Sequence, residues 1–294
     1  MREAEAISHG AITIVNAMAT GRGAAIGIQL WTKAKVEITN DAGCISGRIL
    51  SDTRENDALL RLTVNRVLRR YGLHRKLGAY VETTSNIPIA VGLKSSSAAS
   101  NAVALATVAA LRKRVNYLEV LRLAVKSSFD AGVTLTGAFD DASACLLGGL
   151  VVTDNIKNEI LQHSRHISGS DSLRVVIYVP SGKKYSGSVN RFGFRKIKDL
   201  VNLAHAEAIK GNYSFSMTLN GIAYCKAFGY DTSPVTDALR EGALAASLSG
   251  KGPAIAAIVR NDNVKHLISA WSSYPGKIIQ TGLNYEKAKA KIIS

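Results

Sequence analysis

Pro88-Ile89-Ala90-Val91-Gly92-Leu93-Lys94-Ser95-Ser96-Ser97-Ala98-Ala99 is the stretch that decides the fold, because it joins an expected strand to an expected buried helix. Before it, residues 79–84 alternate in polarity and are rich in β-forming residues, which predicts a strand. After it, residues 98–111 carry only three polar side chains, which predicts a helix that is buried nearly all round. The Gly/Ser turn between the two is typical of an anion-binding loop.

The chemistry of this turn suits a phosphate group. The first N–H groups of a helix have no partner within the helix, and the helix dipole places about half a positive charge there. Gly92 allows close approach of the backbone, and the serines offer hydroxyl groups to a phosphate or to Mg²⁺. An ordinary turn with Ser95 as helix cap is the alternative, and the turn alone does not separate the two. The spacing matches neither a Walker A loop nor GxGxxG, so a different phosphate loop is required.

Composition indicates a globular protein of two domains. The chain has 294 residues, of which 47% are hydrophobic and 20% are charged. Its longest uncharged apolar run, residues 102–111, is too short to cross a membrane, and its N-terminus has no signal-peptide pattern. Three widely spaced cysteines argue against a disulfide framework or a zinc site. We therefore expect a cytoplasmic protein with no membrane partner.

The net charge of +15 raises the question of a nucleic-acid partner. The basic residues are dispersed along the chain, however, and the aromatic content is only 6%, with no aromatic-basic motif typical of RNA binding. We therefore expect no nucleic acid as the main partner. A basic surface would also attract anionic nucleotides and a carboxylate substrate.

Three motifs in order resemble those of the GHMP kinases, the superfamily of galactokinase, homoserine kinase and mevalonate kinase. Pro88–Ser96 is similar to the superfamily's phosphate-binding motif, Pro-x-x-x-Gly-Leu-x-Ser-Ser. Residues 19–23 (Ala-Thr-Gly-Arg-Gly) resemble its first motif, and residues 247–254 (Ser-Leu-Ser-Gly-Lys-Gly-Pro-Ala) its third. Together with residues 136–142 (Thr-Gly-Ala-Phe-Asp-Asp-Ala), the sequences of these motifs look most like those of the archaeal type of shikimate kinase.

The resemblance implies an α+β, two-domain GHMP kinase fold. A ribosomal-S5-like N-terminal domain would span residues 1–158 and bind the nucleotide, and a ferredoxin-like C-terminal domain would span residues 159–294, with the boundary in a polar, turn-rich segment. The implied reaction is ATP- and Mg²⁺-dependent phosphorylation of the 3-hydroxyl of shikimate. Homoserine or mevalonate as the acceptor remains an alternative, and so does a non-catalytic nucleic-acid-binding protein. The sequence does not determine the oligomeric state, and a homodimer is one possibility.

Asp140 and Asp141 form the second chemically loaded region. Two adjacent acids before the small, mostly apolar residues 142–149 are costly to bury unless a positive or protic group meets them, although a solvated turn or helix cap would avoid that cost. The resemblance points to Asp140 as the acid that accepts the proton of the substrate hydroxyl, with Asp141 as the fallback. Arg22 stands where the superfamily commonly has Lys near the transferred phosphate, which implies charge stabilisation.

The resemblance also assigns binding residues. Those for the nucleotide are Pro88, Ile89, Ala90, Val91, Gly92, Leu93, Lys94, Ser95, Ser96 and Ser97, with Ser249, Gly250 and Gly252 from the third motif. Those for the acceptor are Thr20, Gly21 and Gly23 of the first motif. A carboxylate acceptor would also need a cation, which Arg191, Lys183 or Arg54 could supply, and the sequence does not rank these three. Those for Mg²⁺ are Ser96 and Asp130, although Asp130 also suits an ordinary helix end.

Lys94 and Lys251 depart from the superfamily, which often has Gly at both positions. Either ammonium group can point into solvent or touch phosphate. If these backbones needed a positive φ, the contacts carried over from the superfamily would be in doubt.

Overall fold

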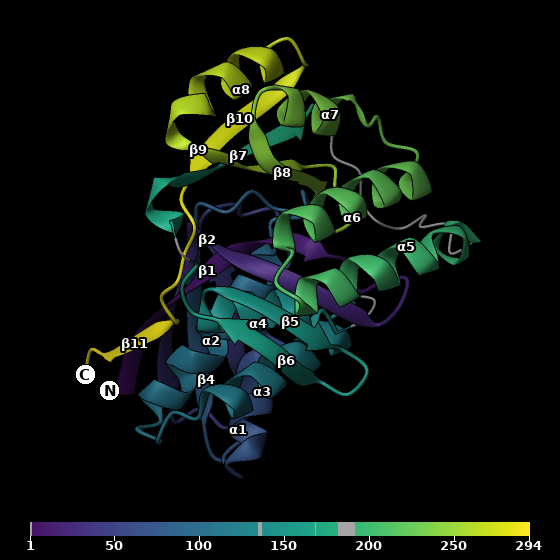
Figure 1. Cartoon of the computed structure of the whole chain (residues 1–294). Coiled ribbons are helices and arrows are strands. Elements are labelled where there is room, and N and C mark those ends of the chain that lie inside the picture. The colour runs from purple at the N-terminus through teal and green to yellow at the C-terminus, as the bar shows by residue number, and fades with distance from the viewer. Residues whose placement is uncertain (1, 135–136, 168, 182–191) are drawn as a thin grey trace.

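The computed structural model describes residues 2–134, 137–167, 169–181 and 192–294. Over these residues the chain forms two sheets with helices packed around them (Figure 1). The first sheet contains β1 (Arg2–Val15), β2 (Arg22–Thr39), β3 (Ile45–Ile49), β4 (Gly78–Ser85), β5 (Leu150–Asp154), β6 (Glu159–Ser164) and β11 (Lys289–Ile292). The second contains β7 (Leu173–Pro180), β8 (Ala243–Leu248), β9 (Ile255–Arg260) and β10 (Gly276–Thr281).

The first sheet is built around the long strand β2. One edge of β2 pairs with β1 along most of its length, while its C-terminal half also pairs with β4 and its N-terminal end with β5. All described pairings in this sheet are antiparallel except that of β3 with β4. The helices beside it are α1 (Ala58–Arg70), α2 (Ser95–Ala110), α3 (Tyr117–Asp130) and α4 (Phe139–Leu147).

Helix α2 is the central helix of this part of the molecule. It packs against β1 and β2 on one side and against α1, α3 and α4 on the others. Only its first two residues and Ala99 are partly exposed. The prediction of a helix buried nearly all round is therefore confirmed, and its N-terminus is the end that is left accessible.

The second sheet has a ferredoxin-like topology. Its strand order is β10-β7-β9-β8, and all its pairings are antiparallel. Between β7 and β8 lie α5 (Phe192–Ile209), α6 (Tyr213–Phe228) and α7 (Ser233–Arg240), and α8 (Val264–Trp271) lies between β9 and β10. This is the βαββαβ arrangement with additional helices, so the expected ferredoxin-like half is present.

The predicted domain boundary between residues 158 and 159 lies at the turn between β5 and β6. Strand β6 pairs with β5, so residues 155–158 form a hairpin turn of the first sheet. Strand β11 pairs with β1, which brings the chain back to the first sheet after the second is complete. Both β6 and β11 are therefore strands of the first sheet, although both follow residue 158.

Local features mark the ends of several helices. Gly72, with φ +68°, follows the end of α1, and the side chain of Asn116 caps α3 by accepting hydrogen bonds from two backbone N–H groups. Helix α1 begins at Ala58, and before it the Asp52 carboxylate accepts hydrogen bonds from the backbone N–H and the guanidinium of Arg54. Helix α7 ends at Arg240, and β8 follows it.

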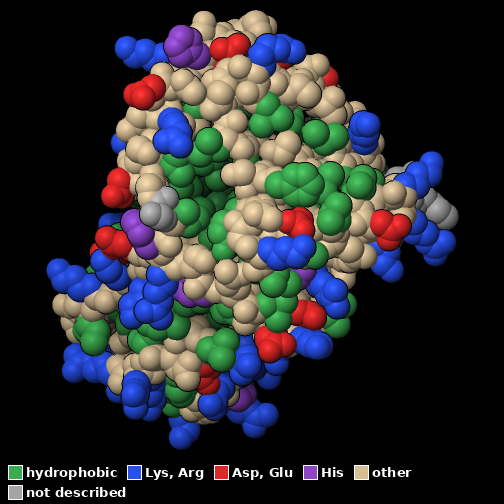
Figure 2. Space-filling view, in the orientation of Figure 1, with side chains coloured by type: hydrophobic (Ala, Val, Ile, Leu, Met, Phe, Trp, Pro, Cys, Tyr) green, Lys and Arg blue, Asp and Glu red, His purple; other side chains and the backbone are tan. Residues whose placement is uncertain are grey.

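One apolar cluster joins the two sheets. It contains Ile14 and Val15 of β1 together with Tyr224 of α6 and Leu248 of β8, so the two parts share a core. Lys and Arg side chains are frequent over the part that holds α1 and α3 (Figure 2). Within the described residues no helix has the length and apolar character needed to cross a membrane.

Candidate active site

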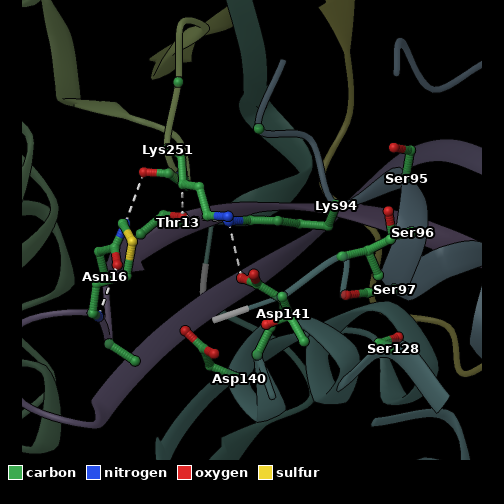
Figure 3. Close-up of a pocket in the computed structure, with 18 of the residues that line it drawn as sticks. Thr13, Asn16, Lys94, Ser95, Ser96, Ser97, Ser128, Asp140, Asp141 and Lys251 are labelled. Carbon is green, nitrogen blue, oxygen red and sulfur yellow. Dashed lines mark hydrogen bonds and ion pairs between the residues drawn. The ribbon is translucent and has the colours of Figure 1, made fainter. Parts of the chain in front are cut away.

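A cavity of about 200 Å³ lies where five segments of the chain meet. These segments are the end of β1, the loop before α2, the end of α3 with the residues after it, the start of α4, and the loop between β8 and β9 (Figure 3). The lining residues are Thr13, Asn16, Ala17, Met18, Ala90, Gly92, Lys94, Ser95, Ser96, Ser97, Ser128, Val133, Thr134, Ala138, Asp140, Asp141, Gly250, Lys251 and Gly252.

The loop before α2 alternates between the cavity and the core. Ala90, Gly92 and Lys94 line the cavity, whereas Val91 and Leu93 are buried in the apolar cluster. The three serines of the first turn of α2 also line it, so the helix N-terminus opens onto the cavity (Figure 3). Pro88, Ile89, Val91 and Leu93, which were predicted to contact nucleotide, are not among the lining residues. Within the phosphate-binding motif, the cavity is therefore lined by alternate residues of the loop, Ala90, Gly92 and Lys94, and by the first residues of α2.

The loop between β8 and β9 is held against the loop before α2. The Ser249 hydroxyl donates to the Gly92 carbonyl at 2.8 Å and accepts from the Thr13 N–H at 3.3 Å, and the Gly250 N–H donates to Thr13 Oγ1 at 2.9 Å. A Cβ on Gly92, where φ is +96°, would lie 2.0 Å from the Ser249 carbonyl oxygen. Ser249 thus fastens the two loops together, while Gly250 and Gly252 line the cavity.

Asp140 and Asp141 lie in the first turn of α4, after Ala138 in the left-handed conformation. Asp140 is 4% exposed. Its Oδ1 accepts a 2.8 Å hydrogen bond from Asn155 Nδ2, and its backbone N–H donates to Asn155 Oδ1. Burial, and then the charge of Asp141, raise the pKa of Asp140 to about 7, although Lys94 and Asn155 act in the opposite direction. A carboxyl group with this pKa can take up a proton near neutral pH.

Lys94 lies inside the cavity and not in solvent. It precedes α2 with φ +64°, and its side chain is only 5% exposed. Its Nζ donates to Thr13 Oγ1 at 2.8 Å and lies 3.0 Å from Asp141 Oδ1 (Figure 3). Lys251 also lines the cavity, and burial together with the Lys94 charge lowers its pKa. Two cations and two carboxyl groups therefore share one small space.

The segment around Arg22 lies outside the cavity, although one of its residues touches the acid. Arg22 is exposed at the start of β2, and Thr20 Oγ1 is hydrogen-bonded to the backbone of Arg22. A Cβ on Gly21 would meet Ile156, whereas a Cβ on Gly23 would lie 2.3 Å from Asp140 Oδ2. Gly23 thus makes room for the buried carboxylate.

Asp130 is the predicted metal ligand that the structure places elsewhere. It ends α3 and pairs with Arg66 of α1, beside a separate, more open hollow. The cation candidates for a substrate carboxylate are not brought to the cavity either, since Arg54 pairs with Asp52 on the surface. Arg191 and Lys183 lie outside the described residues.

Sequence reasoning missed the amides that support the site. Asn16 Nδ2 donates to the Gly250 carbonyl at 2.7 Å, and the Asn16 N–H donates to Asn220 Oδ1 at 2.8 Å. Asn155 holds Asp140 as described. Asn16 and Asn155 directly follow strands, which is a signal that could have been used, whereas Asn220 lies within α6 with no local signal.

Comparison with known proteins agrees with this geometry. Residues 58–149 match the family described as the GHMP kinases N terminal domain. A protein of Methanosarcina mazei named shikimate kinase is 44% identical over 96% of this chain and 94% of its own length. One of Pyrococcus abyssi with the same name is 43% identical over 93% and 96%. The chain belongs to the GHMP kinases.

Solved GHMP kinases share the fold over nearly the whole chain. Homoserine kinase from Cytophaga hutchinsonii superposes with a TM-score of 0.77 at 17% identity, covering 99% of this chain and 98% of that one. The mevalonate kinase of Methanococcus jannaschii gives 0.72 at 16% identity, covering 95% and 98%. The two-domain α+β fold expected from the motifs is therefore confirmed, and membership of this family makes the protein a small-molecule kinase that uses ATP.

Proposed function

We propose that this protein transfers the γ-phosphoryl group of ATP to the 3-hydroxyl of shikimate, giving shikimate 3-phosphate and ADP. The observation that carries the proposal is the buried Asp140, which faces the same cavity as the N-terminus of α2. The choice of shikimate as acceptor is supported by the archaeal relatives that carry that name, at 37–44% identity over most of the chain.

The cavity has the features that the phosphates of ATP require. The free N–H groups of α2 and its dipole favour negative charge. Gly92 has no side chain to fill the narrow gap below the β8–β9 loop, and Lys94 and Lys251 add positive charge. We therefore place the triphosphate between the start of α2 and residues 250–252.

Mg²⁺ is part of the proposal as the partner of the nucleotide. No group of three or more His, Cys, Asp or Glu side chains suited to a metal occurs in the described part of the chain. This fits Mg²⁺, which usually takes one or two protein oxygens and completes its shell with phosphates and water. The Ser96 hydroxyl and an acid of the Asp140–Asp141 pair would hold it, and the ion would neutralise charge on the β- and γ-phosphates. Because Asp130 is engaged with Arg66, we do not assign it to the metal.

The residues present can carry out the transfer. Asp140 accepts the proton of the acceptor hydroxyl while the new O–P bond forms and the bond from the γ-phosphorus to the bridging oxygen breaks, which releases ADP. Asn155 keeps the carboxylate oriented through its 2.8 Å hydrogen bond. The surrounding loops exclude water from a residue that is 4% exposed.

The proposal also covers the localisation, the partners and the oligomeric state of the protein. We place it in the cytoplasm, with small molecules as its partners and without a nucleic-acid or membrane partner. A homodimer remains a prediction that light scattering on the purified protein would check.

The test is ADP release by the purified protein with Mg-ATP, offering shikimate, homoserine and mevalonate separately. We expect turnover with shikimate alone, and its loss in Asp140→Asn. Turnover with another acceptor would keep the kinase chemistry and overturn the substrate. No turnover with any of the three, together with salt-sensitive RNA binding, would favour a binding protein instead.

A further inference from the structure

We propose that Lys94 is the residue whose ammonium group contacts the transferred phosphoryl group, and that Asp141 holds this group in position before the nucleotide binds. The inference rests on the proposed kinase function and deepens it. It assigns to the loop before α2 the charge that the first motif would otherwise supply through Arg22.

The position of the ammonium group is the first observation. Lys94 Nζ lies between Thr13 Oγ1 at 2.8 Å and Asp141 Oδ1 at 3.0 Å. A Cβ built on Gly250 would be 2.9 Å from this nitrogen, so the ammonium lies directly beneath the β8–β9 loop. Figure 3 shows the Lys94 side chain extending across the cavity above Asp140 and Asp141, with Ser95, Ser96 and Ser97 next to its backbone end. This is the space that the proposed reaction gives to the phosphates.

The cost of having lysine here is the second observation. Residue 94 has φ +64°, a conformation that glycine adopts freely and that side chains with a Cβ adopt at a cost. Burial of the ammonium removes it from water, which is a further cost that one carboxylate only partly offsets. Glycine would avoid both costs. Residues kept in such conformations against stability cluster at sites where they act.

Other cations fit the role less well. Arg22 is exposed and does not line the cavity. Among the described residues that line it, the cations are Lys94 and Lys251. The pKa of Lys251 is lowered by burial and by the charge of Lys94, whereas Lys94 has Asp141 in direct contact. The ammonium closest to the catalytic acids is therefore that of Lys94.

Lys94 would act by charge and hydrogen bonding and form no covalent bond. An ammonium group has three donors, of which Thr13 and Asp141 occupy two in the structure. As the acceptor O–P bond forms and the bridging O–P bond breaks, the acceptor proton goes to Asp140, ADP leaves, and Lys94 keeps its protons. The positive charge of Lys94 offsets the negative charge on the oxygens of the phosphoryl group during its transfer.

The first test is Lys94→Gly, because glycine suits the backbone at this position. Glycine relieves the backbone strain but leaves Asp141 without its cation, so thermal melting is used only to confirm that the variant is folded at the assay temperature. Affinity for Mg-AMP-PNP, measured by titration calorimetry, should fall about 10-fold or more, and affinity for Mg-ADP should fall much less. The turnover number should fall about 100-fold or more. Arg112→Gly is the matched control, since Arg112 is an exposed basic residue with φ +53° just past the other end of α2.

The double variant Lys94→Gly/Asp141→Asn separates a direct role from simple neutralisation of Asp141. If Lys94 contacts the phosphoryl group, the double variant keeps the weakened affinity for Mg-AMP-PNP. Recovery of wild-type affinity in the double variant would overturn the inference, because the lysine would then only cancel the charge of its partner.

The two proposals fail in different ways. If the wild-type protein binds neither nucleotide and turns over no acceptor, the kinase function is overturned and the inference with it. If the wild type binds and turns over, but Lys94→Gly keeps the wild-type preference for the triphosphate and the wild-type turnover, only the inference is overturned.

Discussion

Two ion pairs of similar composition lie near helix ends in this molecule, and they differ in their surroundings. Lys94 and Asp141 join the start of α2 to the start of α4, with side chains 5% and 18% exposed. Arg66 and Asp130 join α1 to the end of α3, with side chains 29% and 45% exposed. Loops cover the first pair, and solvent reaches the second. Both pairs place an acid beside a cation, but only the Lys94–Asp141 pair is enclosed by backbone. This enclosure, and not the pairing of charges, makes Lys94–Asp141 part of the candidate site.

The largest expected effect comes from removing the acid next to the buried pair. Asp140→Asn keeps the shape of the side chain but removes the base, so turnover should fall about 10²–10⁴-fold while Mg-ADP still binds. Asp130→Asn is the matched change at the exposed pair and should alter turnover less than about 2-fold. ADP release measures both. Equal losses in the two variants would contradict the comparison.

The covering loops can be tested through glycine. Gly92→Ala introduces a Cβ 2.0 Å from the Ser249 carbonyl oxygen at φ +96°, and we expect unfolding free energy to fall by about 3 kcal/mol. Gly132→Ala, near Asp130, has φ +68° and no atom within 4 Å of the new Cβ, so only the backbone cost of about 1 kcal/mol applies. Denaturant unfolding gives both values. A loss at Gly92 no larger than at Gly132 would show that the two loops are not in close contact.

The enclosed acid should also make stability depend on pH. The pKa of Asp140 in the folded protein, about 7, lies above its ordinary value of 3.8, so the unfolded chain loses this proton first as pH rises. The group therefore destabilises the fold progressively between these two values and fully above about pH 7. Asp140→Asn should gain stability relative to the wild type, by on the order of a few kcal/mol, when both are melted at about pH 8 instead of about pH 4. A constant difference across this range would argue against a perturbed carboxyl group.

The rate of the reaction should also depend on pH through the ionisation of Asp140. Because the base must be ionised, kcat/KM for the acceptor should rise about 10-fold per pH unit below about pH 7 and level off above it. The measurement is a pH profile of kcat/KM, because this quantity reports the pKa values of the free enzyme. A profile that is flat from about pH 5.5 to pH 8 would show that another group, or a step other than proton transfer, limits the reaction.

The smallest effect belongs to the exposed pair. Arg66→Gln removes its cation and should lower the unfolding free energy by less than about 1 kcal/mol, with an even smaller loss at high salt. Thermal melting at two salt concentrations measures this. A loss of several kcal/mol that does not depend on salt would mean that this pair behaves as a buried one.

The sequence was sufficient for features that are contiguous in the chain. The strand–turn–helix unit around Gly92 carries its own signals, and Asp140 lies in a motif that is read from neighbouring residues. What could not be predicted depends on contacts between distant residues. The hydrogen bond from Gly250 to Thr13 spans 237 residues, and that from Asn16 to Asn220 spans 204.

The side-chain direction of Lys94 and the position of Asp130 also depend on contacts between distant residues, and the sequence did not predict them. Whether Lys94 points inward depends on Asp141 and Thr13, which come from two other elements. Asp130 was predicted as a metal ligand, but packing of α3 against α1 places it beside Arg66. Local pattern supplied the residue types, and packing between elements decided which of them meet.

Strand β11 has a consequence for the order in which the protein is made. The chain leaves the first sheet after β6, builds the second sheet, and then returns through residues 282–288 to pair with β1. On the way, Asn284 accepts a hydrogen bond from the Gly149 N–H, and Ala288 donates one to the Leu146 carbonyl, at the end of the helix that carries Asp140. A nascent chain still lacking these residues therefore contains every motif, but its first sheet is unfinished and one end of α4 lacks these contacts. The candidate site is thus complete only after residues 282–292 have been made.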